Sequence, residues 1–418
     1  MDATYIYIGL ALAFGLFMAW GIGANDVANA MATSIGSGAL TIKQALLVAG
    51  VFEFAGAVLA GGEVTKTIRK GMVDTAEFSA QPEILVFGML ASLLAAGTWL
   101  LIASRNGWPV STTHSIVGAI VGFAVVSVGF GAVQWGKVGT IVMSWVISPL
   151  TAGLIAYGIF TSIKKLILAH KKPFKRARQY APWYVFAAVT LIALVTIFKG
   201  LKHVGLELTT WQAYLVAVTF GATVAMASKL VINRMKVAKQ LSRRMHYAKV
   251  EGVFAVLMVV TACSMAFAHG SNDVANAIGP VAAVVSIATE GSVAQQAGLP
   301  IWVLIVGGLG IVVGLGTYGV RVIKTVGSQI TQLTPVRGFS AEIAAAFTIV
   351  VASGTGIPVS TTHTLIGAVL GVGLAKGVHA VNMGVVGRIV TSWVVTIPAG
   401  AILSIVFFLI LRELLGGG

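Results

Sequence analysis

The stretch Pro109-Val110-Ser111-Thr112-Thr113-His114 decides the fold, because it returns in the second half of the chain as Pro358-Val359-Ser360-Thr361-Thr362-His363. A second phrase, GANDVANA at 23–30, returns as GSNDVANA at 270–277. The two polar phrases recur in the same order and at nearly the same spacing. Internal similarity of this kind is typical of structural repeats. The sequence therefore predicts two repeats whose polar phrases meet at a shared site.

The composition places both repeats in a membrane. Hydrophobic residues make up 57% of the chain and charged residues 10%, whereas soluble domains carry about 25% charge. Several apolar runs approach the ~20 residues that a helix needs to cross a bilayer. The first residues, Met1 to Thr4, lack the basic region of a signal peptide, so we expect the first run to remain as a span. We predict an all-α, multi-pass integral protein of the cell membrane with about 12 membrane segments.

Positive charge is concentrated in two linkers. The net charge is +15, and the segments 164–178 and 229–249 each carry seven Lys or Arg residues. Both clusters flank apolar runs, so the positive-inside rule places them in the cytoplasm, with contact to lipid headgroups as a secondary role. This placement argues against a nucleic-acid partner and makes the lipid bilayer the expected surroundings.

The linkers predict the topology of the repeats. If both linkers are inside, the hairpin between them goes out and returns, and five passes lie on each side of it. An odd number of passes puts the amino terminus outside and inverts the second repeat, which gives antiparallel repeats with broken or re-entrant helices. Hydropathy leaves open whether the segments before Pro109 and Pro358 span the membrane or turn back inside it. The predicted units are a first repeat at 1–160, the linkers with a central transmembrane hairpin at 161–249, and a second repeat at 250–418.

The Asn-Asp phrase has the chemistry of a cation site. On a helix its two Asn residues and its Asp share one face, and a helix break beside Gly23 would add free carbonyl groups. Carboxylate, amide and carbonyl oxygens are ligands for hard cations. The alternative is that Asn25 or Asp26 only caps a helix that begins at Val27, but duplicated acids inside a membrane are costly and favour a function. The predicted sodium ligands are Asn25, Asp26, Asn29, Asn272, Asp273 and Asn276.

The Ser-Thr phrase has the chemistry of an anion site. Pro109 suits the first turn of a helix, and the free N–H groups of a helix start attract anions. Hydroxyl groups can donate to an oxyanion without adding a full charge, which keeps binding reversible. The alternative is that Ser111 and Ser360 cap the helices while the threonines bond to the backbone; the duplication favours a function. The predicted anion ligands are Ser111, Thr112, Thr113, Ser360, Thr361 and Thr362.

Four further ionisable residues are weaker candidates. His114 and His363 follow the Ser-Thr phrases and could donate to the anion, relay protons, or bond to a carbonyl as structural residues. Glu53 and Glu342 lie in apolar runs and are candidate acids of an ion pathway, although Glu342 could simply end a helix. The run 301–320 corresponds loosely to the span that carries Glu53, but it has no acid at its centre.

The phrases GANDVANA and PVSTTH closely resemble those of the inorganic phosphate transporter family, the Pit-type permeases. That family includes sodium- or proton-coupled phosphate symporters, and some members carry sulfate. The resemblance covers both repeats and extends to Phe52-Glu53-Phe54, while the large hydrophilic central loop of some members is missing. It implies a homodimeric phosphate permease with no cofactor, in which the Asn-Asp residues form the ion side of the site and the Ser-Thr residues the phosphate side.

We therefore expect a secondary active symporter that imports inorganic phosphate with a cation, by alternating access around a midplane site formed by both repeats. Sodium is the favoured cation, since amide and carbonyl oxygens can complete its shell without titrating. Proton-coupled transport of phosphate, or sulfate transport by the same fold, is the alternative. An anion channel fits less well, because discrete acids beside an anion site indicate stoichiometric coupling. An enzyme is least expected, since the acids and histidines lack a spacing such as His-Glu-x-x-His.

Overall fold

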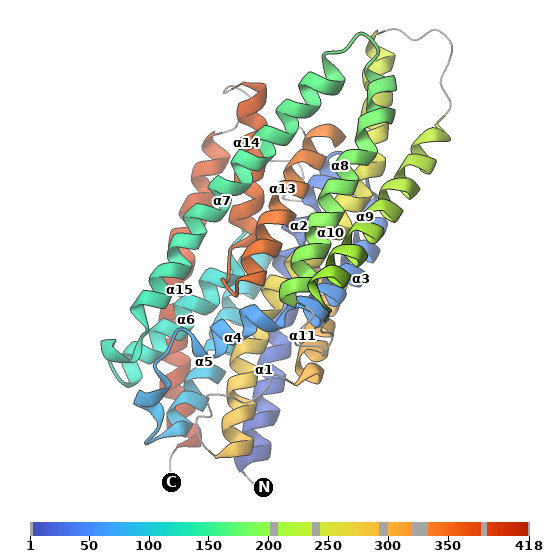
Figure 1. Cartoon of the computed structure of the whole chain (residues 1–418). Coiled ribbons are helices and arrows are strands. Elements are labelled where there is room, and N and C mark those ends of the chain that lie inside the picture. The colour runs from blue at the N-terminus through green and yellow to red at the C-terminus, as the bar shows by residue number, and fades with distance from the viewer. Residues whose placement is uncertain are drawn as a thin grey trace.

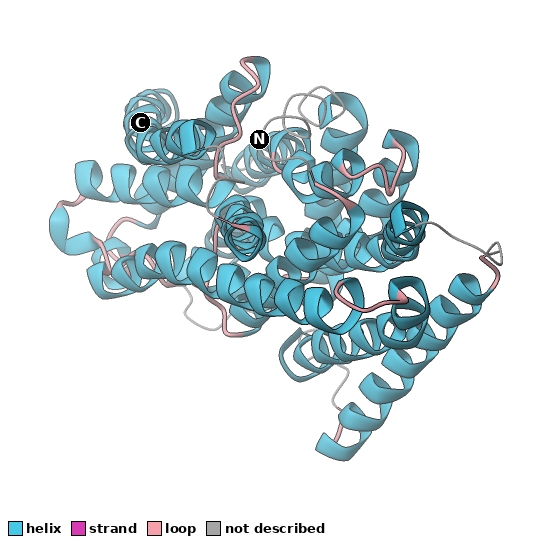
Figure 2. Cartoon of the chain, turned by 90° about the horizontal axis from the view of Figure 1, so that it is seen from above, coloured by secondary structure: helices cyan, strands magenta, loops and turns pink. Residues whose placement is uncertain are grey.

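The computed structural model describes residues 3–200, 208–235, 243–291, 300–319, 333–377 and 383–416. Within these ranges the chain is a bundle of helices joined by short loops, with no strand drawn (Figure 2). Ten of the described helices are long and apolar enough to cross a membrane. This confirms the prediction of an all-α, multi-pass membrane protein.

The helices follow the predicted order. The first repeat contains α1 (Ala3–Asn25), α2 (Val27–Gly36), α3 (Ile42–Ala60), α4 (Gly62–Lys70), α5 (Pro82–Arg105), α6 (Thr112–Ser127) and α7 (Trp135–Ile163). The central hairpin consists of α8 (Pro173–Val195) and α9 (Thr210–Asn233). The second repeat contains α10 (Arg243–Glu290), α11 (Ile301–Gly314), α13 (Pro335–Gly354), α14 (Thr361–Lys376) and α15 (Met383–Leu415).

Each Ser-Thr phrase follows the tip of a helical hairpin. α5 and α6 form the first hairpin, and α13 and α14 form the second. The hairpins lie in opposite halves of the molecule, α5 and α6 in the lower half of Figure 1 and α13 and α14 in the upper half. The segments before Pro109 and Pro358 therefore turn back at the middle of the protein, which answers the question that hydropathy leaves open.

Glycine makes both hairpin tips possible. Gly107 and Gly356 have φ values of 67° and 74°, a left-handed conformation that residues with a Cβ rarely adopt. The residue after each glycine donates a backbone hydrogen bond to the carbonyl five residues before it, as at the end of a Schellman motif. These bonds run from Trp108 to Ala103 at 2.9 Å and from Ile357 to Ala352 at 3.1 Å.

The prediction that Pro109 lies in the first turn of α6 is wrong. The helix begins only after Ser111, which is its N-cap and has an extended backbone. The carbonyl oxygen of Pro109 accepts a hydrogen bond from the Ser392 hydroxyl at 3.2 Å, and that of Pro358 accepts one from Ser144 at 3.3 Å. The extended residues after each proline thus let each tip reach a helix of the other repeat.

The two repeats interlock. α1, α3, α10 and α11 pack together, while α7 packs against α14 and α6 packs against α15, so each of these groups draws helices from both repeats. Glycine permits the closest crossings. A Cβ on Gly371 would overlap the carbonyl oxygen of Gly153, and one on Gly118 would overlap that of Ile397. These contacts hold the backbones of α14 and α7, and of α6 and α15, closer than any other residue would allow.

The helix break expected at the Asn-Asp phrases is small in one copy and missing in the other. α1 and α2 are separated by Asp26 alone, which keeps helical φ and ψ of −88° and −32° and donates its N–H to the Ile22 carbonyl at 2.9 Å. In the second repeat, α10 runs unbroken for 48 residues through Asp273 (Figure 1). The interruptions that expose backbone groups lie instead at the two hairpin tips.

The positions of the two chain termini agree with an even number of membrane passes. Both termini lie at the lower end of Figure 1, and the connection from α7 to α8 lies at the upper end. The basic linkers are therefore at the end opposite to the termini. This is the arrangement that the charge distribution predicts, with the repeats running antiparallel.

Candidate functional site

Two buried aspartates, one from each Asn-Asp phrase, form the centre of the site. Asp26 is 1% exposed and Asp273 is fully buried. The Thr112 hydroxyl donates to Asp26 Oδ2 at 2.9 Å, and the Thr362 hydroxyl donates to Asp26 Oδ1 at 2.7 Å. One carboxylate is thus held by a threonine from each of the two Ser-Thr phrases. The cation and anion sides expected from the sequence meet in a single cluster.

Thr112 also reaches the second aspartate. Its hydroxyl oxygen lies 3.2 Å from Asp273 Oδ1, which also accepts a hydrogen bond from Asn276 Nδ2 at 2.9 Å. The same Asn276 amide lies 3.2 Å from the Thr112 hydroxyl and 3.3 Å from the Thr113 hydroxyl. A hydroxyl carries one hydrogen, so Thr112 can satisfy only one of the two carboxylates at a time.

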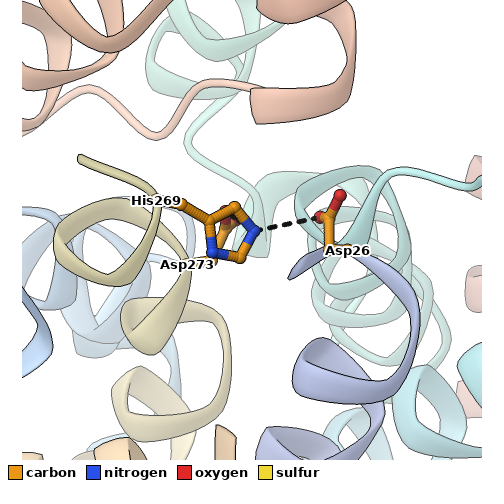
Figure 3. Close-up of side chains that lie close together, drawn as sticks. All are labelled: Asp26, His269 and Asp273. Carbon is orange, nitrogen blue, oxygen red and sulfur yellow. Dashed lines mark ion pairs between the residues drawn. The ribbon is translucent and has the colours of Figure 1, made fainter. Parts of the chain in front are cut away.

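His269 joins the cluster although the sequence analysis did not identify it. Its Nε2 lies 3.0 Å from Asp273 Oδ2 and 3.9 Å from Asp26 Oδ2, and its Nδ1 lies 2.7 Å from Glu53 Oε2. Figure 3 shows the ring of His269 directed toward Asp26. Ligand atoms of Asp26, His269 and Asp273 all lie within 4.8 Å of one another, close enough to hold one cation. The available signal was its position four residues before Asp273, on the same helix face.

The charge balance of this cluster favours a cation. Three carboxylates, those of Asp26, Asp273 and Glu53, surround a single imidazole, and all four groups are buried. Like charges repel strongly where the local dielectric is low. Positive charge brought between Asp26 and Asp273 would relieve this repulsion, and their oxygens are ligands that sodium accepts.

His269 and Glu53 correspond to two apolar residues in the other half of the fold. A Cβ on Gly270 would overlap the Glu53 carbonyl oxygen, just as one on Gly23 would overlap that of Ile311. Glu53 and Ile311 therefore occupy equivalent places, and the residue before each glycine is His269 or Ile22. Both isoleucines are fully buried. The two repeats are related in backbone but not in charge.

Asn25 and Asn272 hold the hairpin tips. Asn25 donates to the Trp108 carbonyl at 3.1 Å and accepts from the Val110 N–H at 3.4 Å. Asn272 likewise donates to the Val359 carbonyl at 2.7 Å and accepts from the N–H of the same residue at 3.2 Å. These amides join each tip to the helix that carries the aspartate. Their place among the cation ligands stays a prediction, and the side chain of Asn29 lies outside the described residues.

The serines of the Ser-Thr phrases act as helix caps. Ser111 accepts a hydrogen bond from the His114 N–H, and Ser360 accepts one from the His363 N–H, each at 3.3 Å. The Thr113 hydroxyl donates to the Val359 carbonyl at 3.1 Å, joining the two tips. Thr361 is the first residue of α14 and is buried. A helix start from each repeat is thus directed toward the aspartates.

The two motif histidines contact each other and a tryptophan. The rings of His114 and His363 lie 4.4 Å apart between centroids, edge to face. The His114 ring also lies 3.7 Å from the Trp145 ring, and His363 Nδ1 lies 3.4 Å from the Trp145 carbonyl oxygen. The structure thus gives both histidines a packing role at the contact between repeats. Roles in donating to the anion or relaying protons stay predictions.

Glu342 lies apart from the aspartates in a polar cluster of its own. Its carboxylate is fully buried and accepts hydrogen bonds from the hydroxyls of Thr33, Ser34 and Thr261, each at 2.5 Å. It lies in the interior of α13, so it does not end a helix. Leu93, at the same position relative to the first Ser-Thr phrase, is buried and apolar. This acid is therefore another feature that only one repeat has.

The fold and the buried cluster define a multi-pass integral membrane protein with a polar site shared by two repeats. Comparison with known proteins gives the family. Residues 22–404 match the phosphate transporter family, and the chain belongs to it. The chain is therefore a transporter and not an enzyme.

Relatives match over nearly the whole chain. A putative phosphate permease of Haemophilus influenzae is 50% identical over 408 residues, which cover 97% of each chain. The chloroplastic inorganic phosphate transporter 2-1 of Arabidopsis thaliana is 43% identical over 97% of this chain and 72% of its own. A solved structure described as "The sodium-dependent phosphate transporter" is 39% identical, has a TM-score of 0.91, and aligns over 98% of this chain and all of its own.

Proposed function

We propose that the protein is a symporter that imports inorganic phosphate together with a cation, by alternating access around the site between the repeats. The observation that carries the proposal is the position of Thr112, whose hydroxyl lies between Asp26 and Asp273. Phosphate is the substrate that the family supports, whereas the coupling mode is inferred from the chemistry of the site.

The shared threonines provide a physical route for coupling. While the hydroxyls of Thr112 and Thr362 donate to Asp26, they are not available to an anion. A cation bound at the carboxylate replaces those donors, and the hydroxyls can then turn toward a phosphate oxygen. Each ligand thus improves the binding of the other, and this enhancement is reciprocal by linkage.

The phosphate side of the proposed site is built from the two helix starts. The free N–H groups at the start of α6 and α14 and the positive ends of their dipoles favour an oxyanion. The two hairpins bring these starts together, because the Thr113 hydroxyl bonds to the tip of the other repeat. The proposed phosphate ligands are Ser111, Thr112, Thr113, Ser360, Thr361 and Thr362.

Sodium is the proposed coupling ion. Its shell requires several oxygens at short range, and the buried carboxylate oxygens of Asp26 and Asp273 lie beside the Thr112 hydroxyl. The side-chain amide of Asn276 lies next to them, with its Nδ2 donating to Asp273. The solved relative described as sodium-dependent also favours this choice. Proton coupling is the second candidate, since protonation of an aspartate would relieve the same repulsion.

Glu342 is proposed as a second cation position on the ion pathway. A carboxylate with three hydroxyl neighbours supplies hard oxygen ligands, and none of the ion pairs among the described residues involves it. Glu53 is proposed to act through His269, which it orients toward the aspartates.

We also propose a homodimer, which chemical cross-linking in native membranes would test.

Uptake into proteoliposomes tests the proposal. Labelled phosphate should accumulate above its external concentration only when a sodium gradient is imposed. Accumulation driven by a pH gradient without sodium would replace sodium with protons. Phosphate that equilibrates but never accumulates would indicate a channel, and competition by sulfate would show whether the site separates the two oxyanions.

A further inference from the structure

The two basic linkers have a charge pattern that transport chemistry does not use. The segments 161–182 and 229–249 contain fourteen Lys and Arg residues and no Asp or Glu. We refer to the described Lys and Arg residues of both segments as the basic collar. None of them is within 4.0 Å of a described carboxylate, since the ion pairs among described residues lie elsewhere.

The fold brings the two linkers together. The Tyr247 hydroxyl at the start of α10 donates to the Leu168 carbonyl after α7 at 3.1 Å. Arg178 on α8 donates to the carbonyl of Asn233, the last residue of α9, at 2.6 Å. Segments joined by contacts 55 and 79 residues apart in the chain therefore place their charges on one end of the molecule, the upper end of Figure 1.

Aromatic rings orient part of the collar. The guanidinium of Arg176 lies over the Tyr180 ring at 5.6 Å and donates to its hydroxyl at 3.1 Å. The guanidinium of Arg178 lies over the Phe174 ring at 5.5 Å. Such stacking fixes side chains that would otherwise lose entropy on binding. The neighbouring lysines on this linker are exposed, namely Lys171, Lys172 and Lys175.

The collar lies at the depth of lipid headgroups. Trp183 is 67% exposed at the point where α8 becomes apolar, and tryptophan favours the membrane interface. Lys175 precedes it on the same helix by eight residues, or about 12 Å at 1.5 Å per residue. The charges of the collar therefore lie just outside the apolar layer, where phosphodiester groups are found.

We propose that the basic collar binds the phosphate groups of anionic phospholipids in the adjoining leaflet. An unneutralised basic surface at this depth is complementary to such lipids, and each Lys or Arg near an anionic bilayer contributes about a fivefold gain in binding. The positive-inside rule alone needs charge only during insertion. It predicts no preference for anionic lipid once the protein is folded and oriented.

Titration of the full-length protein with fluorescent phosphatidylglycerol and phosphatidylcholine, in detergent and after delipidation, tests the proposal. The wild-type protein should prefer phosphatidylglycerol, and high salt should weaken this preference because salt screens exposed charge. The variant K171Q/K172Q should lower the affinity for phosphatidylglycerol about tenfold or more. The control K66Q/K137Q removes the same charge from exposed lysines outside the collar and should change it less than about twofold.

Three results would overturn the proposal. The first is equal affinity of the wild-type protein for both lipids at low salt, a measurement that depends on no variant. The second is an equal loss in the collar variant and its control. The third is displacement of the bound lipid by millimolar inorganic phosphate, which would make the collar a site for the soluble anion. Transport and size-exclusion profiles of both variants should match those of the wild-type protein.

Discussion

At the scale of single residues, Thr112 is the side chain on which the proposed coupling depends. Thr112→Val removes the hydroxyl and keeps the shape, so Asp26 and Asp273 lose the one donor that they share. Hydrogen bonds to charged groups are worth about 1.5–3 kcal/mol, and phosphate affinity should fall about tenfold or more. Thr112→Ser keeps the hydroxyl and should retain most activity. Phosphate binding across a sodium series checks this, and an unchanged sodium dependence in Thr112→Val would contradict the shared-hydroxyl route.

Glu342 allows a second test at this scale. Glu342→Gln keeps the size and an oxygen acceptor for the hydroxyls of Thr33 and Ser34, and its amide nitrogen can donate to the Thr261 hydroxyl oxygen in place of the bond that Thr261 now donates, but it removes the charge. The protein should therefore still fold, while the sodium concentration for half-maximal uptake rises several-fold. Glu63→Gln is the control, since Glu63 pairs with the exposed Lys66. A sodium dependence that is identical in both variants would reduce Glu342 to a structural acid.

A variant of Asn25 can show whether this residue holds the hairpin tip in place or binds the cation. Its amide bonds to the backbone of the first hairpin tip. Removing the amide leaves these buried backbone groups without a hydrogen-bond partner, which costs about 1–3 kcal/mol. Asn25→Ala should lower the melting temperature in detergent, and Asn272→Ala should lower it by a similar amount because its bonds are equivalent. Normal thermal stability combined with an altered sodium dependence would instead support Asn25 and Asn272 as cation ligands.

The sequence pointed to most residues of this buried cluster but not to their arrangement. The duplicated phrases pointed to Asp26, Asp273 and the threonines, because two identical polar phrases in an apolar chain have few structural explanations. They could not show that the threonines donate to the aspartates, since this contact depends on where the hairpin tips lie. His269 was missed because its position four residues before Asp273 places the two side chains on one face only if α10 runs unbroken through both.

At the scale of elements, glycine contacts determine how the two repeats cross. Gly371 lies against the Gly153 backbone, so a Cβ there would overlap it. Gly371→Ala should destabilise the protein by about 1–3 kcal/mol, the usual effect of overpacking. Gly139→Ala on α7 is the control, because a Cβ there meets no atom within 4 Å. Thermal unfolding in detergent measures both, and equal melting temperatures would show that the α7–α14 crossing can relax.

Hydropathy and periodicity could predict the helices but not the hairpins. By length and composition, α5 could span a membrane on its own, as could nine other described helices. Only tertiary contacts show that the chain turns back after it. The tip signal was nevertheless present in the sequence, as a glycine two residues before each proline, at Gly107 and Gly356. Its meaning depends on the positive φ of both residues, which a sequence does not specify.

At the scale of the whole molecule, the repeats share a backbone plan but differ in charge. The acids Glu53 and Glu342 have the apolar counterparts Ile311 and Leu93. In the proposed alternating-access cycle, symmetric backbones would allow the two halves to exchange conformations. The unequal charges would make the proposed ion pathways toward the two membrane faces different, so the direction of the protein in the membrane would affect its function.

That direction is predicted by the basic linkers and can be measured. A cysteine at Lys171 should react with a membrane-impermeant reagent only from the cytoplasm, and one at Thr4 only from outside. The reason is that the connection from α7 to α8 and the start of α1 lie at opposite ends of the molecule (Figure 1). Cys263→Ser provides a background free of the native thiol. Permeabilised cells, in which both cysteines should react, control for accessibility. Labelling of both cysteines from one side of intact cells would mean an even number of passes before the first linker. That result would contradict the inverted repeats and the assignment of the collar to the cytoplasmic leaflet.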